Sequence, residues 1–285
     1  MNPFIAPFAN GMAFFPGLSA CLAGLLVSLT QKSRLARHAS NLLITIGLVL
    51  IAASATPLPL YLYGALGIVT LAFWLLARTG NQPLLRRAGV VVVVGVYLGS
   101  GCWEARFHIT PKLTVNRTQT IYVIGDSISA GLINGEETWP DILARKTGIK
   151  TVNLARAGAR IHDGGQQAQK IPRSDSLVFL EMGGNDLLGS TSAASFGQSL
   201  RMLLGTLQER GVKIVMFEFP LYPGANAFGS EQRKAAAEFH ITLIPKSLMT
   251  AVFTTPGATV DGIHLSPSGH QLWAEKIAAL MQIEP

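Results

Sequence analysis

The sequence predicts an α/β fold, in which helices sandwich a five-stranded parallel sheet of flavodoxin-like order, preceded by a four-helix transmembrane region. Two observations carry this prediction. Residues 104–285 alternate short apolar runs with helical patterns, which is typical of a parallel sheet covered on both faces. Residues 1–103 hold six basic residues, no acidic ones, and long uncharged apolar segments, which indicates a membrane region.

The composition agrees with a chain that is partly embedded in a membrane. Hydrophobic residues make up 49% of the chain and charged residues 14%, which is too apolar for an ordinary soluble protein. The first 103 residues supply +6 of the net charge of +7. The basic character therefore comes from the membrane region rather than from a basic patch on a folded domain, and we expect no nucleic-acid partner.

Four apolar segments of the first 103 residues are each near the ~20 residues that cross a hydrocarbon core. They cover residues 11–30, 41–57, 60–77 and 88–103. Six glycines in these segments are expected to let helices pack closely: Gly24, Gly47, Gly64, Gly67, Gly95 and Gly99. The two cysteines of the chain, Cys21 and Cys102, fall at different expected depths, so a disulfide between them is not expected.

The basic residues set the expected orientation. They gather in residues 31–40 and 78–87, and such loops face the cytoplasm. The amino terminus is then outside, and four crossings place everything after Trp103 in the periplasm of a bacterial inner membrane. A polar linker, residues 104–118, reaches at most ~50 Å. The domain of residues 119–285 is therefore expected to work beside the lipid bilayer.

Within residues 119–285 the apolar runs predict strands over 121–124, 150–154, 176–182, 212–219 and 241–244. Helical patterns cover 138–147, 161–170, 194–210 and 231–240, and Ser266 with Pro267 begins a last helix. Polar motifs follow three of these strands, and a fourth closes the domain. Because ligands bind outside the carboxyl ends of parallel strands, we expect these motifs to form one site.

The four motifs are Gly125-Asp126-Ser127, Asn153 with Ala155 and Gly158, Gly183-Gly184-Asn185-Asp186, and Asp261-Gly262-Ile263-His264. In this order they resemble the four blocks of the SGNH (GDSL) hydrolases. The surrounding residues are similar to the arylesterase and lysophospholipase/thioesterase branch of that family. The resemblance covers about residues 119–283 and not the membrane region, which leaves the substrate range open.

The chemistry of these residue types fits a serine ester hydrolase. Ser127 needs an adjacent base to act as a nucleophile, and His264 is the candidate, because Asp261 lies three residues before it. The resemblance implies three donors for an oxyanion: the N–H groups of Ser127 and Gly158 and the Asn185 amide. A side chain at Gly158 would hinder the approach of a ligand to the backbone. No cofactor and no metal are expected.

Other interpretations stay open at this point. The same Ser127 chemistry could transfer an acyl group to a glycan or lipid instead of to water. The domain could be a non-catalytic binding or scaffold module. A metal site of a phosphodiesterase could be built from Asp126, Asp186, Asp261 and His264, although no paired ligand spacing supports one. The two aspartates Asp126 and Asp186 are expected to hold loops, and His270 is expected to be structural.

Overall fold

The computed structural model describes residues 1–30, 33–78, 83–133, 135–173 and 175–284. The chain forms two compact units. The helical unit comprises Pro7–Arg106 and Leu221–Asn226, and the α/β unit comprises Met1–Ala6, Phe107–Pro220 and Ala227–Pro285.

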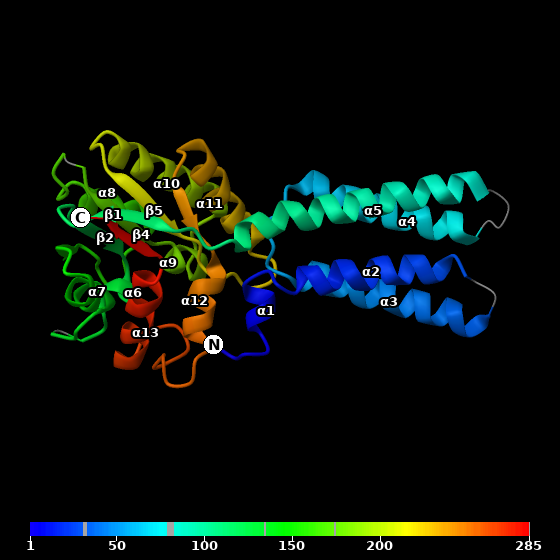
Figure 1. The fold of residues 1–285 in the computed structure, drawn as a ribbon, viewed down its shortest axis with the longest axis horizontal. Helices are drawn as coiled ribbons and strands as arrows, with labels where there is room; N and C mark the ends of the chain where they lie inside the picture. Colours follow the sequence, from blue (N-terminus) through cyan, green and yellow to red (C-terminus); the bar gives the residue numbers. More distant parts are fainter. Residues whose placement is uncertain (31–32, 79–82, 134, 174, 285) are drawn as a thin grey trace. The chain divides into compact units, whose positions relative to one another are not determined.

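The helices of the amino-terminal third are α1 (Ala6–Ala9), α2 (Phe14–Ser28), α3 (Arg34–Ala53), α4 (Leu60–Arg78) and α5 (Pro83–Ala105). α2 packs along α3, and α4 packs along α5 (Figure 1). Among the described residues, three stretches are long and apolar enough to cross a membrane: Arg34–Ala53, Leu60–Arg78 and Leu84–His108. α2 has 15 residues, about 22 Å, against a hydrocarbon core of ~30 Å. The sequence predicts four membrane spans. The lengths of α3, α4 and α5 support three of them, whereas α2 is shorter than a usual span.

Two of these helices begin earlier than the sequence predicts. α3 begins at Arg34, where the Ser33 hydroxyl accepts the N–H of Ala36 at 3.1 Å, and α5 begins at Pro83. Residues expected in cytoplasmic loops therefore lie within helices: Arg34, Arg37, His38, Arg86 and Arg87. Hydropathy locates the apolar middle of a helix, whereas its ends depend on capping and on long polar side chains. Residues 31–32 and 79–82 of the expected loops lie outside the described residues.

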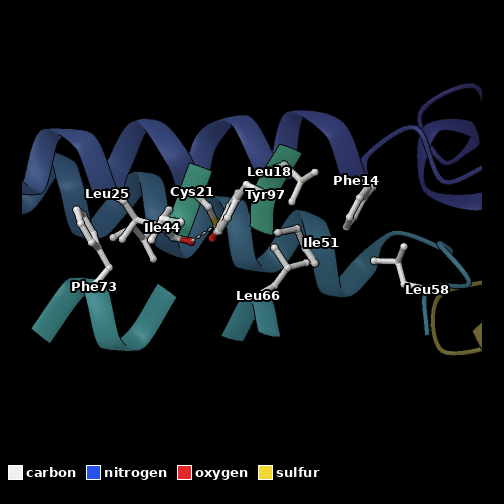
Figure 2. Close-up of a cluster of buried hydrophobic side chains, with 11 residues drawn as sticks. Phe14, Leu18, Cys21, Leu25, Ile44, Ile51, Leu58, Leu66, Phe73 and Tyr97 are labelled. Atoms are coloured by element: carbon white, nitrogen blue, oxygen red, sulfur yellow. Dashed lines mark hydrogen bonds between the residues drawn. The ribbon is translucent and has the colours of Figure 1, made fainter. Parts of the chain in front are cut away.

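The core of the helical unit is a cluster of buried side chains contributed by α2, α3, α4 and α5 (Figure 2). Of the six glycines that the sequence predicts at helix contacts, two lie where neighbouring helices touch: Gly24 and Gly47. A Cβ at Gly47 would be 2.6 Å from the Cys21 nitrogen, and a Cβ at Gly24 would be 2.8 Å from the Ser40 oxygen. Among the described residues, a Cβ at any of the other four would meet no atom within 4 Å: Gly64, Gly67, Gly95 and Gly99. The expectation of close packing is wrong for these four. Both cysteines are free.

The α/β unit is built on the parallel sheet that the sequence predicts. Its strands are β2 (Ile121–Gly125), β3 (Thr151–Asn153), β4 (Leu177–Glu181), β5 (Lys213–Phe217) and β6 (Thr242–Ile244). They lie in the order β3-β2-β4-β5-β6 and pair in parallel. In chain order this is the flavodoxin-like arrangement 2-1-3-4-5, and the prediction of the sheet order is confirmed. Every residue of β2 and β4 is buried, as expected for strands covered on both faces.

Helices and 3₁₀ turns of this unit flank the sheet (Figure 1). They are η1 (Arg106–His108), α6 (Ser127–Ala130), α7 (Trp139–Thr147), η2 (Ile161–Asp163), α8 (Gly164–Ala168), α9 (Gly184–Leu188), α10 (Ala193–Gln208), α11 (Asn226–Glu238), α12 (Lys246–Phe253) and α13 (Pro267–Ala278). α12 is not predicted from the sequence. Its eight residues are short for a periodic pattern to be recognised.

A second, two-stranded sheet is also missed by the sequence. β1 (Leu113–Asn116) pairs in parallel with β7 (Met281–Glu284), in the register Leu113↔Met281. β1 falls within residues 104–118, which the sequence predicts to be a linker. Four-residue strands carry a weak signal on their own, and each of these is stabilised by a partner from the other end of the domain.

Two short segments belong to a different unit from the residues next to them in the sequence: Met1–Ala6 and Leu221–Asn226. The amino group of Met1 donates to the carbonyl oxygens of Phe253 at 2.7 Å and Gly262 at 3.3 Å, within the α/β unit. The loop Leu221–Asn226 after β5 is part of the helical unit. There the Leu221 N–H donates to the Ala9 oxygen at 3.1 Å. The chain therefore leaves the α/β unit after Ala6 and returns to it at Phe107.

Candidate active site

The turn that carries Ser127 directly follows the central strand β2. Gly125 ends the strand, and a Cβ there would lie 2.7 Å from the side chain of Ser129, so only glycine fits. Asp126 caps the next helix, because its Oδ1 atom accepts the N–H of Ile128 at 3.0 Å. This short helix, α6, begins at Ser127, whose side chain is half-buried at the carboxyl edge of the sheet. The hydroxyl therefore lies where the sequence places a nucleophile.

His264 and Asp261 form a pair in the loop before α13. The Asp261 Oδ2 atom lies 2.6 Å from the His264 Nδ1 atom. The other oxygen, Oδ1, accepts the backbone N–H groups of Ile263 at 3.0 Å and His264 at 2.8 Å. The hydrogen bond from the His264 ring, followed by those from the backbone, holds the pKa of Asp261 well below its ordinary value. A charged Asp261 keeps the proton of a neutral imidazole on Nδ1 and leaves the Nε2 lone pair available as a base.

Two of the three residues expected to bind an oxyanion, Gly158 and Asn185, lie in the segments that follow β3 and β4. Asn185 is in α9, where its Nδ2 group donates to the Ala159 oxygen at 3.0 Å and to Asp126 Oδ2 at 3.4 Å. Gly158 is exposed and has φ +76°, a conformation that favours glycine. A Cβ at Gly158 would meet no atom of the described part of the chain within 4 Å. The positive φ therefore explains this glycine, and the open space beside it leaves room for a ligand.

Asn153, the first residue of its motif, supports the turn from the neighbouring strand. Its Nδ2 group donates to the Ser129 carbonyl oxygen at 2.7 Å, and its Oδ1 atom accepts the N–H of Ala155 at 3.1 Å. Asp186 accepts the N–H of Ile161 at 2.8 Å and is fully buried. Asp126 and Asp186 thus hold loops through backbone hydrogen bonds, as the sequence predicts. A metal ion would need a different arrangement: no group of three or more His, Cys, Asp or Glu among the described residues could hold one.

Asp126 links the motifs to one another. Its two oxygens contact the Ser127 turn and Asn185. The side chain is 2% exposed, and burial raises the pKa of its carboxyl to about 6. The hydrogen bonds within the described part of the chain do not include one between Ser127 Oγ and His264. Such bonds are often long in ligand-free enzymes and shorten when the substrate binds.

His270 has the structural role that the sequence predicts. It is 1% exposed, and its Nδ1 atom accepts the backbone N–H of Trp139 at 3.2 Å. Burial lowers the pKa of this imidazole, so the neutral form is favoured. His270 therefore braces the start of α7 and is separate from the Asp261–His264 pair.

Sequence reasoning missed one functional candidate, the buried acid Glu181 at the end of β4. Its side chain is 4% exposed, and its Oε2 atom accepts a hydrogen bond from the Ser129 hydroxyl at 2.8 Å. The same hydroxyl accepts the indole N–H of Trp139 at 3.1 Å. The available signal was an ionisable residue in an otherwise apolar buried strand, because such a residue needs a buried polar partner.

Comparisons with known proteins match the part of the chain that carries these motifs. The model of the GDSL-like lipase/acylhydrolase family matches residues 123–272, more than half of the chain. The chain is 26% identical over 192 residues to the thioesterase 1/protease 1/lysophospholipase L1 of Escherichia coli strain K12, covering 63% of this chain and 92% of that protein. It is also 26% identical over 159 residues to the esterase TesA of Pseudomonas aeruginosa, covering 51% and 79%.

Solved structures show the same fold in the α/β unit. A crystal structure of TesA has a TM-score of 0.51 at 25% identity and covers 57% of this chain and 97% of that chain. The psychrotrophic esterase EstA from Pseudoalteromonas sp. has a TM-score of 0.50 at 20% identity, over 56% and 95%, which shows the fold alone. The family match, the relatives and the flavodoxin-like sheet lead to one conclusion. The chain belongs to the GDSL-like lipase/acylhydrolase family, that is, to the SGNH hydrolases, and is a carboxylic ester hydrolase.

Proposed function

We propose that this protein is a membrane-anchored serine ester hydrolase that cleaves acyl or acetyl esters of lipids or glycans at the periplasmic face of a bacterial inner membrane. Ser127 is the nucleophile, His264 the general base, and Asp261 orients and stabilises the imidazole. The observation that carries this proposal is the 2.6 Å contact between His264 Nδ1 and Asp261 Oδ2. In the same unit, Asp126 is hydrogen-bonded both to the Ser127 turn and to Asn185.

The proposed reaction has two halves. The Ser127 oxygen attacks the ester carbonyl carbon while His264 Nε2 takes the hydroxyl proton, and the carbonyl oxygen becomes an oxyanion. The N–H groups of Ser127 and Gly158 and the Asn185 amide donate hydrogen bonds to that oxyanion. His264 gives its proton to the departing alcohol, and an acyl-enzyme remains. Water then attacks the acyl-enzyme with His264 again as base, and the free acid leaves.

The membrane side of the proposal rests on the helical unit and on the path of the chain. Met1 contacts Phe253 and Gly262 of the α/β unit, so the chain before α1 and the α/β unit lie on one side of any membrane that the helices cross. The number of crossings between Ala6 and Phe107 is then even. Three crossings would place Met1 and the α/β unit on opposite sides of the membrane and would break their hydrogen bonds. We therefore count α2 as the fourth span, although it has only 15 residues. The basic residues lie at the helix ends farther along the chain from these contacts, at the starts of α3 and α5, and basic residues favour the cytoplasmic side. The α/β unit is then on the periplasmic side.

This topology predicts a labelling pattern. Cys21 and Cys102 are replaced by alanine, and single cysteines are introduced as Asn2→Cys, Thr118→Cys or Ser33→Cys, all at exposed positions. In intact cells, a membrane-impermeant maleimide should label the variants at positions 2 and 118. The variant at position 33 should react only after the cells are opened. Labelling of position 33 together with position 118 in intact cells would rule out the proposed crossings.

Hydrolysis itself is tested with the full chain in detergent or lipid vesicles. We expect release of free acid from p-nitrophenyl esters, and from lysophospholipids or acetylated glycans if these are substrates. The rate of acid release should not depend on added glycan or lipid acceptors. Acyl transfer to an acceptor at the expense of free acid would identify an acyltransferase. Failure to cleave any ester and to react with a fluorophosphonate would instead indicate a binding module.

A further inference from the structure

A groove that the proposed reaction does not use runs between α3 and α4 of the helical unit. Its volume is about 430 Å³, within the range of ~300–1,000 Å³ that is typical of small-molecule sites. The residues that line it recur every three or four positions, from Asn41 to Leu48 in α3 and from Gly67 to Trp74 in α4. Residues with this spacing lie on one face of a helix, so two facing helical stripes form the α3–α4 groove.

The missing side chain of Gly67 helps to keep the groove open. A Cβ on Gly67 would meet no described atom within 4 Å. Two other lining residues, Leu48 and Leu71, are large and apolar but remain 41% and 58% exposed. The hydroxyl group of Thr70, which also lines the groove, is already hydrogen-bonded to Tyr97 at 2.6 Å. Between helices that are long enough to cross a membrane, such an apolar space is filled by lipid chains.

One end of the groove is polar. The indole N–H of Trp74 donates to the Asn41 Oδ1 atom at 3.1 Å, which joins the last part of α4 to the first part of α3. The Arg78 guanidinium carbon lies 3.4 Å from the centroid of the Trp74 ring, so a positive charge lies beside a residue that lines the groove. From Asn41 to Leu48 the groove extends along the helix for about 10 Å.

Further basic residues continue the α3 stripe beyond this polar end. Arg37 and Arg34 precede Asn41 by four and seven residues, and both are exposed. Their spacing places them on the helix face that lines the groove. Residues 1–103 contain no acidic residue, so no carboxylate of these helices is available to neutralise the charges. The groove is therefore mainly apolar, with positive charge at one end.

We propose that the α3–α4 groove binds an anionic phospholipid of the cytoplasmic leaflet, with one acyl chain between the two stripes and the phosphate group near Arg37 and Arg78. Basic pockets between membrane-spanning helices on the cytoplasmic side bind such head groups in other proteins. In the proposed topology this end of the helices faces the cytoplasm and Ser127 faces the periplasm, so the lipid is not the ester substrate. The inference rests on one part of the proposed function, the anchoring of the helical unit in a membrane.

A helix of a second copy of the chain fits the groove less well than a lipid does. A spanning helix is ~30 Å long, about three times the length of the groove. A second copy in the same membrane would also bring its own basic residues to the same end, where like charges repel. An anionic phospholipid supplies both the apolar chain and the negative charge that the groove lacks.

The test measures phospholipid binding to the full chain in a mild detergent by native mass spectrometry. Dioleoyl phosphatidylglycerol should bind about fivefold or more tightly than the zwitterionic dioleoyl phosphatidylethanolamine, the effect of about one added charge contact at a membrane surface. Gly67→Leu should weaken phosphatidylglycerol binding about tenfold or more, because the added side chain occupies the groove. Thr45→Phe fills the groove from α3 and should have the same effect.

Gly95→Leu is the matched control, because Gly95 has the same open space among the described residues but lies in α5 and is not one of the residues that line the groove. It should bind phosphatidylglycerol like the wild type. Arg37→Gln and Arg78→Gln should each weaken this binding about fivefold through the loss of one charge. Arg117→Gln removes an exposed arginine of the α/β unit and should leave the binding unchanged.

The inference is overturned if folded Gly67→Leu and Thr45→Phe both bind phosphatidylglycerol like the wild type, if Gly95→Leu is equally impaired, or if the two lipids bind equally well. A wild-type dimer that Gly67→Leu dissociates would assign the groove to a second copy instead.

Anchoring is checked separately by washing cell membranes with alkaline carbonate. Release of the chain by the wash would refute the anchoring and this inference together. A chain that stays in the membrane but shows no selective lipid site refutes the inference alone. Neither measurement depends on Ser127 or on ester cleavage.

Discussion

Replacement of Ser127 by alanine is expected to lower kcat/KM for ester hydrolysis by about 10⁴-fold or more, since triad enzymes that lose the nucleophile retain only the contribution of binding and the oxyanion donors. The Ser127 side chain is half-buried at the start of α6 and is not part of the core. The variant should therefore fold normally. Hydrolysis of a p-nitrophenyl ester, measured beside the melting temperature of the same preparation, checks this expectation.

Ser190→Ala is a suitable control, because Ser190 is an exposed serine in the loop after α9. It should hydrolyse the same ester at the wild-type rate. If Ser127→Ala remains folded and keeps more than about a tenth of the wild-type kcat/KM, a loss far below that of a nucleophile, Ser127 is not the nucleophile.

Replacement of His264 by alanine should cost activity on a similar scale, about 10⁴-fold in kcat, because no other base would then take the Ser127 proton. KM for the ester should change little, since the imidazole acts mainly on the chemical step. The fold should tolerate the change: His264 lies in a loop, and its partner Asp261 is exposed.

His270, which is separate from the Asp261–His264 pair, provides the comparison. His270→Asn should retain most of the activity. Its main effect should be on stability. The free energy of unfolding should fall by roughly 1–3 kcal/mol, because the buried N–H of Trp139 would lose a well-placed acceptor. If His270→Asn abolished turnover in a folded protein while His264→Ala did not, the assignment of the base to His264 would be wrong.

The sheet and the loops that carry the site could be read from the sequence because their signals are local. The apolar run of β2 stops at Gly125, and the motif residues follow consecutive strands, so the topology rule for parallel sheets places them at one edge. The contact of His264 with Asp261 is also local, since it spans three residues.

The features that the sequence missed depend on contacts between distant parts of the chain. β1 and β7 are stabilised by each other, and neither four-residue segment indicates a partner. The start of α3 at Arg34 depends on a cap by Ser33 rather than on hydropathy. The hydrogen bond between Glu181 and Ser129 became visible only in the structure, because 52 residues separate the two along the chain. Four glycines of the apolar helices have open space beside them within the described part of the chain, and composition does not reveal which face of a helix meets a neighbour.

The most direct test of the central claim is to identify the residue that becomes covalently modified during catalysis. The full-length protein is treated with a fluorophosphonate, or mixed rapidly with an activated ester and quenched with acid, and its peptides are analysed by mass spectrometry. A single phosphonyl or acyl adduct is expected on Ser127, absent in Ser127→Ala and formed far more slowly in His264→Ala. An adduct on another residue, or ester cleavage that proceeds with Ser127 unmodified, would contradict it.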